Sequence, residues 1–101
     1  MTDGYKAFVD ENVRLIILKA LAEENNGSLN DALLERELER FGYAKTREYL
    51  RNQISWLETE VAAVTTTVAG TALIATLTKN GRYHLERKRF LQGVQQPGDA
   101  E

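Results

Sequence analysis

The feature that most constrains the fold is the short connection between two amphipathic helical segments in the middle of the chain. An apolar stripe at helical spacing runs over residues 34–41 and ends at Gly42, where a glycine commonly terminates a helix. Only Tyr43–Lys45 separate this glycine from Thr46, a residue type that caps the start of a helix. Two amphipathic helices joined by so short a turn predict a helix-turn-helix.

A long first helix is predicted from about Tyr5 to Glu24, because apolar residues recur there at three- and four-residue steps. Phe8, Leu15 and Leu18 lie off the main stripe, so this helix is apolar on much of its circumference. Such a helix is either central to the core or shared with a second subunit. A domain this small cannot easily cover all of that surface by itself, and we therefore expect a homodimer.

The next two helices are placed by their capping residues. Ser28 is predicted to cap the second helix, with Asp31 completing a weak capping box. The third helix is predicted to run from Thr46 to about Glu60. Its inward row, at spacings of four and three residues, is Leu50, Ile54 and Leu57.

The pattern then changes from helical to extended. Val64–Val68 and Thr71–Leu77 are rich in β-branched and apolar residues, and Ala69-Gly70 between them is a candidate two-residue hairpin turn. Thr78 can cap a last helix that extends to about Leu91. We expect this helix to place His84 at the surface or boundary.

The predicted order of elements is three helices, a β-hairpin and a C-terminal helix. This order is typical of the winged helix-turn-helix, an α+β fold in which the hairpin is the wing. The winged-helix domain is predicted to cover residues 1–91. Residues 92–101 contain Gly93, Pro97 and Gly98 among polar neighbours, which predicts a flexible C-terminal tail.

Several functional classes are excluded by composition. The chain has no cysteine and one histidine, so it offers neither thiolate nor histidine-based metal sites, and we expect no metal or cofactor. Its longest apolar stretch, Leu15–Leu18, is too short for a membrane span, and the N-terminus lacks a signal core, so we expect a cytoplasmic protein. Ser28 resembles a cap and Ser55 has no nearby histidine partner, so no enzyme activity is expected.

The net charge of −2 conceals an uneven distribution. Residues 1–44 carry five basic and nine acidic side chains, whereas residues 45–91 carry eight basic and four acidic ones. The positive excess therefore falls on the part of the chain with which a winged helix would meet DNA.

The inward row of the third helix leaves Glu48, Asn52, Ser55 and Thr59 pointing outward. Arginine reads guanine, asparagine reads adenine, and basic residues also hold phosphates. The candidate DNA-binding residues are therefore Lys45, Arg47, Arg51, Asn52, Ser55, Lys79 and Arg82. The alternative is a solvated helix face on which Arg47 and Arg51 pair with acids of the second helix.

Several stretches resemble a family of small proteins encoded by Mu-like bacteriophages and prophages. The matching pieces are Arg14–Leu18, Ser28–Asn30, Leu33–Leu34, Phe41–Tyr43, Ile54–Glu58, Ala75–Arg82, Gly93–Val94 and Pro97. Members of that family usually have a glycine after the third helix, where this chain has Glu60–Ala63. The resemblance implies a winged-helix protein of phage origin that acts in the bacterial cytoplasm, and it carries over no functional residues.

Two hypotheses for function follow. The first is a homodimeric regulatory or packaging protein that binds double-stranded DNA through its third helix. The second is a protein–protein interaction module for another phage protein in assembly or regulation. The second is favoured by the uncharged hairpin tip, Thr67–Thr71, and by Tyr49 and Trp56 beside the outward face of the third helix.

Overall fold

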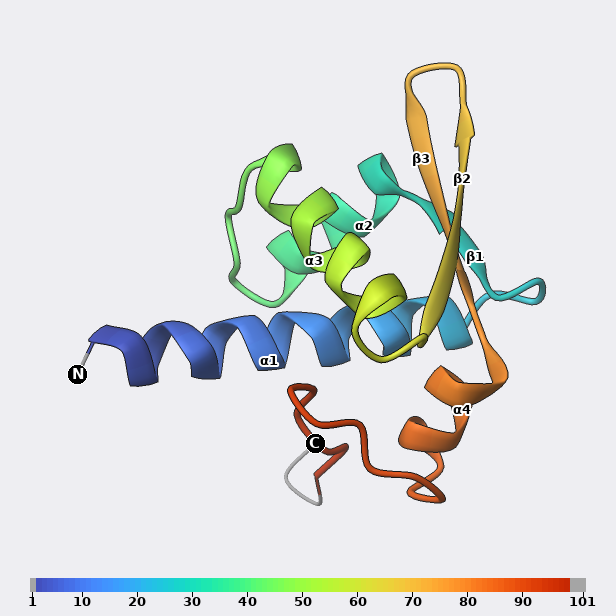
Figure 1. Ribbon diagram of the computed structural model, residues 1–101. Helices are drawn as coiled ribbons and strands as arrows, with labels where there is room; N and C mark the ends of the chain where they lie inside the picture. Colours follow the sequence, from blue (N-terminus) through green and yellow to red (C-terminus); the bar gives the residue numbers. More distant parts are fainter. Residues whose placement is uncertain (1, 99–101) are drawn as a thin grey trace.

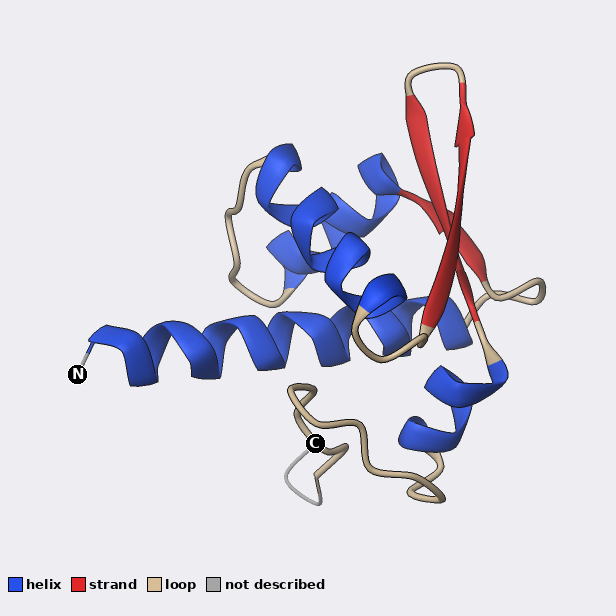
Figure 2. Ribbon diagram, viewed as in Figure 1, coloured by secondary structure: helices blue, strands red, loops and turns tan. Residues whose placement is uncertain are grey.

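The computed structural model describes residues 2–98, which form an α+β arrangement of four helices and a three-stranded antiparallel sheet (Figure 1). The elements are α1 (Thr2–Ala22), β1 (Ser28–Asn30), α2 (Asp31–Arg40), α3 (Arg47–Thr59), β2 (Val64–Ala69), β3 (Ala72–Leu77) and α4 (Lys79–Leu85). The strand order is β1-β3-β2, so β3 is central. Figure 2 shows the sheet to one side of α2 and α3, with the β2–β3 hairpin projecting past them.

α1 lies between two layers, with α2 and α3 on one side and α4 and the segment after it on the other (Figure 1). This placement explains why the helix is apolar around most of its circumference. Leu15 and Leu18, which lie off the main stripe, are only 4% and 0% exposed. Within the described part of α1, the exposed large apolar side chains are Tyr5 and Phe8, near its start. The core therefore accounts for most of the apolar surface that prompted the dimer expectation.

The start of the second helix differs from the prediction. Ser28 belongs to a short strand, β1, where it pairs with Thr76 of β3, and the helix cap is Asn30, whose side chain accepts a hydrogen bond from the Leu33 amide. The amide of Leu77 also donates to the carbonyl of Gly27 and so holds this segment against the sheet. A strand of three residues is too short to show alternation in the sequence.

α3 matches its predicted cap and inward row. The Thr46 hydroxyl accepts a hydrogen bond from the Tyr49 amide, and the inward residues are fully buried. Burying each such side chain contributes about 1.5–3 kcal/mol. The helix ends at Thr59, and Ala62 then adopts a left-handed conformation with φ of 53°. This is the region in which the resembling family has a glycine, so this chain tolerates backbone strain there.

The hairpin turn is shifted by one residue from the prediction. Ala69 pairs with Ala72, which leaves Gly70 and Thr71 as the two turn residues instead of Ala69 and Gly70. Gly70 has φ of 63°, which a glycine adopts without steric cost. The requirement for glycine at this φ, together with pairing that continues to Ala69, fixes the register.

α4 is shorter than predicted, because it ends at Leu85 instead of near Leu91. Arg87 adopts a left-handed conformation with φ of 62°, and the Lys88 amide donates to the carbonyl of Tyr83. The Arg87 amide also donates to the carbonyl of His84. These bonds form a Schellman C-cap in which arginine occupies the position that glycine usually takes. Because no glycine marks this end of the helix, it could not be predicted from the sequence.

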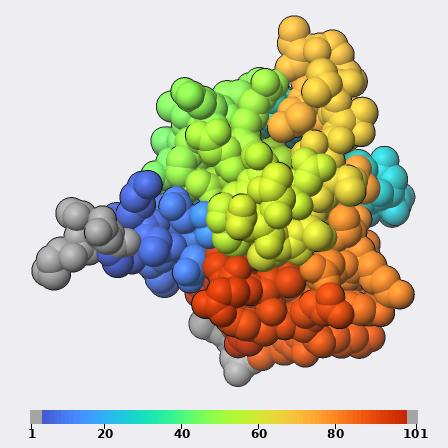
Figure 3. Space-filling view, in the orientation of Figure 1, coloured from blue at the N-terminus to red at the C-terminus, as the bar shows by residue number. Residues whose placement is uncertain are grey.

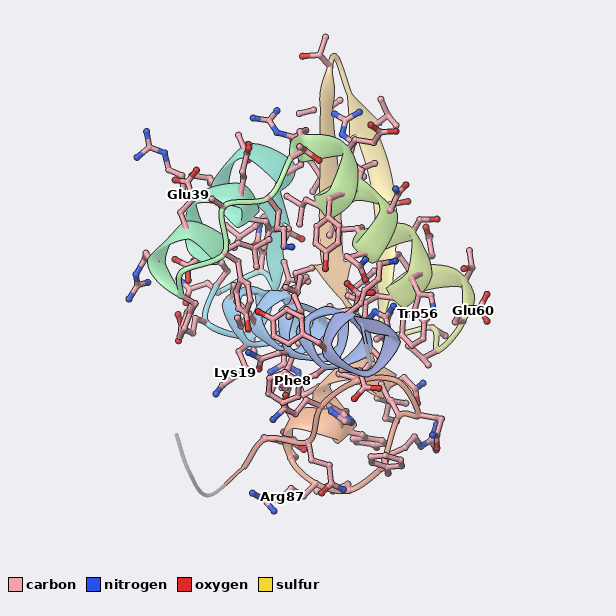
Figure 4. All side chains as sticks on the ribbon, turned by 90° about the vertical axis from the view of Figure 1, so that its left-hand side faces the viewer. Phe8, Lys19, Glu39, Trp56, Glu60 and Arg87 are labelled. Carbon is pink, nitrogen blue, oxygen red and sulfur yellow. The ribbon has the colours of Figure 1, made fainter. Side chains whose placement is uncertain are left out.

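The segment after α4 packs against α1. The sequence predicts a flexible tail from residue 92 onward. Val94 is instead 2% exposed, and the Arg14 guanidinium donates to the Gly93 carbonyl while lying 3.7 Å over the Trp56 ring. Figure 4 shows Trp56 where α3 meets this segment. Residues 93–95 therefore pack against the rest of the domain, whereas residues 99–101 of the expected tail lie outside the described residues.

His84 is buried instead of lying at the surface or boundary, with 1% of the residue exposed. Its Nδ1 accepts a hydrogen bond from the Leu91 amide, and its Nε2 lies 2.9 Å from the carbonyl oxygen of Gln95. Since Nδ1 must accept, the proton sits on Nε2 and is donated to Gln95. The imidazole thus joins α4 to the segment that covers it, an interaction that sequence spacing did not reveal.

Candidate nucleic-acid interface

The outward side of α3 carries the polar residues from which a nucleic-acid interface was predicted. Glu48, Asn52, Ser55 and Thr59 are all exposed, as helical geometry requires once the apolar row faces the core. The side chains of Asn52 and Ser55 make no hydrogen bond to other residues within the range 2–98. They are therefore available to an external partner, and the hairpin stands beside α3 (Figure 1).

Arg47, at the start of the same helix, is held by α2. Its Nε donates to a Glu35 oxygen at 2.8 Å, and a second guanidinium nitrogen lies 2.7 Å from that oxygen. The hydrogen bond to Glu35 raises the pKa of Arg47. The ion pair with an acid of the second helix, one of the two predicted alternatives, is the arrangement present. Much of the positive charge of Arg47 is thereby neutralised within the chain.

Arg51 is a second arginine of α3 that is held by contacts within the chain, and its acidic partner is more buried than that of Arg47. Its guanidinium donates to Asp31 Oδ2 at 2.7 Å and to the Thr71 carbonyl at 2.6 Å. Asp31 is 1% exposed, and it also accepts a hydrogen bond from the Leu73 amide. Arg51 therefore joins the start of α2, the middle of α3 and the hairpin turn.

Two opposing effects act on the pKa of Asp31. Burial raises it by disfavouring the carboxylate, whereas the hydrogen bonds from Arg51 and the Leu73 amide lower it by stabilising the charged form. The net pKa is lowered, so Asp31 is a carboxylate at neutral pH. Arg51 is consequently engaged as the counter-ion of Asp31, and this ion pair limits its capacity to contact a base.

Lys45 precedes α3 and lies beside an aromatic side chain. Its Nζ is 4.9 Å from the centroid of the Tyr49 ring, in a cation–π contact. The Tyr49 hydroxyl donates to Asp10 of α1 at 2.5 Å, and burial together with this bond raises the pKa of Tyr49. Tyr49 is thus a half-buried link between α1 and α3, so the aromatic surface expected beside the outward face of α3 is smaller than predicted.

Sequence reasoning missed a contact that fixes the hairpin against α3. The carboxylate of Glu58 accepts hydrogen bonds from both the amide and the hydroxyl of Thr66 in β2. Because β2 is an edge strand, this amide would otherwise face outward without a strand partner. Glu58 therefore covers part of the open edge. The only sequence signal for it was an acid at the penultimate position of α3.

The remaining two predicted residues, Lys79 and Arg82, lie on α4, on the other side of α1 from α3 (Figure 1). Both are exposed, and the Arg82 guanidinium approaches Gly27. The seven predicted residues thus fall into two groups. One group is on α3 and its N-terminal approach, and the other is on α4, where basic residues surround the ring of Tyr83.

No cluster of three or more metal-ligating side chains occurs among residues 2–98. Over the same range, no helix combines the length and the apolarity that crossing a membrane requires. The hairpin tip, Thr67–Thr71, is exposed and has only hydroxyl and apolar side chains, with Val68 71% exposed. Any contact that it makes must therefore involve hydrogen bonds or apolar surface and not ion pairs.

Comparison with known proteins identifies a relative in a bacteriophage. Over 87 residues the chain is 31% identical to a protein of Escherichia phage Mu described as "Uncharacterized protein gp26". The matched region covers 86% of this chain and 88% of the phage protein. No protein-family model matches the chain, and no solved structure does.

Proposed function

The chain belongs to the family of the Escherichia phage Mu protein gp26, and we propose that it is a winged-helix protein that binds double-stranded DNA. In this proposal α3 enters the major groove, which is wide enough to admit an α-helix. The β2–β3 hairpin is the wing and lies beside it. The proposal extends to a role in phage regulation or DNA packaging in the host cytoplasm, without enzymatic activity.

The observation that carries the proposal is the outward row of α3. Asn52 and Ser55 are exposed and unengaged within the described residues, on a rigid helix anchored by a fully buried apolar row. An asparagine can donate to and accept from an adenine edge, and a serine can contact either a base or a phosphate. Glu48 on the same row would repel phosphate but can accept from the amino group of cytosine.

The topology supports the winged-helix part of the proposal. The short strand β1 between α1 and α2 pairs with β3, so that the hairpin is attached to the body of the domain through a three-stranded sheet. Arg51 and Glu58 each join α3 to this hairpin. The reading helix and the wing are therefore held in one fixed relation, which a preorganised DNA-binding surface needs.

The dimer remains part of the proposal. Tyr5 and Phe8, 73% and 55% exposed, lie near the start of α1, where that helix extends past α3 (Figure 1). Two copies that paired there would present two α3 helices, as proteins that read paired half-sites do. Light scattering is expected to give twice the monomer mass, and Phe8→Ser is expected to shift the distribution toward monomer. A monomer at high concentration contradicts this part.

The experiment that tests DNA binding uses fluorescence anisotropy with a library of labelled duplexes, followed by the preferred sequence. Asn52→Ala with Ser55→Ala is expected to weaken binding to that sequence by roughly tenfold to a hundredfold, since a good bidentate base contact contributes about 1–3 kcal/mol. The matched control is Arg36→Ala, at an exposed position of α2. Equal affinity of the double variant and the wild type would contradict the assignment of α3.

The protein-interaction module is the second candidate, and one observation favours it. The hairpin tip is uncharged and exposes Val68, while Arg47 and Arg51 are neutralised within the chain. If no duplex binds at low salt, this candidate becomes the better one. A tip variant such as Val68→Asp would then be expected to abolish capture of a phage-encoded partner without unfolding the domain.

A further inference from the structure

The densest positive charge in the structure lies around one aromatic ring. Lys79 Nζ is 5.6 Å from the centroid of Tyr83, Lys88 Nζ is 5.8 Å from it, and the Arg89 guanidinium carbon is 5.9 Å from it. We name these four residues the Tyr83 cluster. Lys79 lies one helical turn before Tyr83, whereas the other two cations are brought back by the turn that ends α4. Their grouping depends on Arg87 being left-handed.

This cluster is only partly neutralised by the chain itself. Lys88 lies 3.3 Å from Glu86 in an ion pair whose two side chains are 65% and 44% exposed, and such a pair is weak. Arg89 donates to the side chain of Asn80, which carries no charge. Lys79, Lys88 and Arg89 are all exposed. Three like charges around one ring repel one another, and an anion placed among them would relieve that repulsion.

A shallow hollow adjoins the cluster. It has a volume of about 180 Å³, and Lys88 and Arg89 line it together with Phe90 and Pro97. Arg87 also lines it and donates to the Pro97 carbonyl, and Figure 4 shows Arg87 at the edge of the domain. The hollow is large enough for a phosphate group, and two members of the Tyr83 cluster reach into its lining.

The segment that follows α4 reaches α3, because Arg14 contacts both the Gly93 carbonyl and the Trp56 ring. Figure 3 shows α3 on the visible surface between the hairpin above it and the segment after α4 below it. The two arginines of α3 pair with Glu35 and Asp31, so α3 itself offers little free positive charge. A duplex lying along this face would therefore find its main electrostatic attraction at the other end, on α4 and the turn after it.

We propose that the Tyr83 cluster binds phosphates of the nucleic-acid backbone and supplies most of the salt-dependent, sequence-independent affinity for DNA. This inference rests on the proposed DNA-binding function but assigns the charge contacts to a surface separate from α3. The aromatic ring keeps the cations together through cation–π contacts, and each cation can then neutralise a phosphate. Specific reading would remain with Asn52 and Ser55.

The test is a salt series of binding to a random-sequence duplex. The variant carries Lys79→Gln, Lys88→Gln and Arg89→Gln. The slope of log affinity against log salt is negative, and each lost phosphate contact reduces its magnitude by about 0.9. Loss of three contacts therefore reduces the magnitude by about 2.7. Over a fourfold change in salt, that difference amounts to about 40-fold in affinity. Circular dichroism checks that the variant is folded, as expected for exposed side chains.

The matched control changes three exposed cations elsewhere, Lys6→Gln, Arg36→Gln and Arg40→Gln. It alters the net charge equally, and its slope is expected to stay near that of the wild type. If the cluster variant also keeps the wild-type slope, the inference is overturned while binding through α3 stands. If the cluster variant has a reduced slope while the Asn52→Ala, Ser55→Ala variant binds with full affinity, the cluster binds phosphates and the proposed role of α3 is contradicted. If wild type binds no duplex, both proposals fail.

Discussion

Replacing Arg51 by alanine should reveal whether this arginine is a structural link or a free DNA-reading residue. In the folded protein its guanidinium neutralises the Asp31 carboxylate, which is 1% exposed, and it also holds the Thr71 carbonyl at the hairpin turn. The variant leaves Asp31 with the Leu73 amide as its remaining hydrogen-bond donor among the contacts described above. A buried carboxylate without its counter-ion is then the main cost.

The magnitude follows from how buried the pair is. Removing one partner of a fully buried pair costs about 3–5 kcal/mol, but the Arg51 side chain is 42% exposed, so water would reach the carboxylate in the variant. Loss of the hydrogen bond to the Thr71 carbonyl adds about 1 kcal/mol. We therefore expect the free energy of unfolding to fall by about 2 kcal/mol at pH 7. For a domain of this size, that lowers Tm by roughly 8–16 °C.

The assay is urea denaturation followed by circular dichroism at two pH values. The pKa of Asp31 is lowered in the folded state, so the stability that it contributes is present above its unfolded pKa of about 3.9 and is lost as pH falls through the folded pKa. The difference between wild type and Arg51→Ala should accordingly be large at pH 7 and shrink at the acid end. Adding Asp31→Asn to the variant should recover part of the loss.

Unfolding of Arg51→Ala at the same urea concentration as wild type at pH 7 would rule out a structural role for Arg51. The control is Arg36→Ala, an exposed arginine on α2, which should change stability by less than about 0.5 kcal/mol. A variant of Arg51 that retained stability but lost DNA affinity would instead identify it as a direct DNA contact.

Three further predictions concern the backbone and the core. Ala62→Gly should raise the free energy of unfolding by about 0.5–1 kcal/mol in urea denaturation, because glycine relieves the left-handed strain; a loss of stability would contradict the strain argument. Gly93→Ala should lower the free energy of unfolding by about 2 kcal/mol, because φ at this residue is 93° and an added Cβ would come within 2.5 Å of the Trp56 ring. A thermal melt like that of wild type would show that the segment relaxes freely. Nitrogen NMR of His84 should show the Nε2–H tautomer at neutral pH, and an Nδ1–H tautomer would rule out acceptance from the Leu91 amide.

Much of the fold could be predicted because it depends on local signals. The cap at Thr46, the inward row of α3 and the existence of the hairpin follow from residue type and spacing, and all are present in the structure. β1 was missed because its three residues form a strand only by pairing with β3, which lies far along the chain. The early end of α4 was missed because Arg87 occupies a left-handed position that usually signals itself by glycine.

The candidate interface shows the same division. Helical geometry alone placed Asn52 and Ser55 outward, and the structure has both exposed. It could not decide whether Arg47 and Arg51 are free, because that depends on how α2 is oriented against α3. The Tyr83 cluster was visible only as a basic run. Its grouping around one ring depends on the turn after α4, which no sequence period describes.

The most direct test of the proposed DNA interface is a titration of nitrogen-15-labelled protein with a short duplex, followed by amide NMR. We expect the shifts to concentrate on Asn52 and Ser55 of α3, on the hairpin turn at Gly70, and on the segment from Lys79 to Arg89. The signals of the amides at the C-terminal end of α2 should not shift. Shifts confined to α2, or no shifts at low salt, would contradict DNA binding through this face.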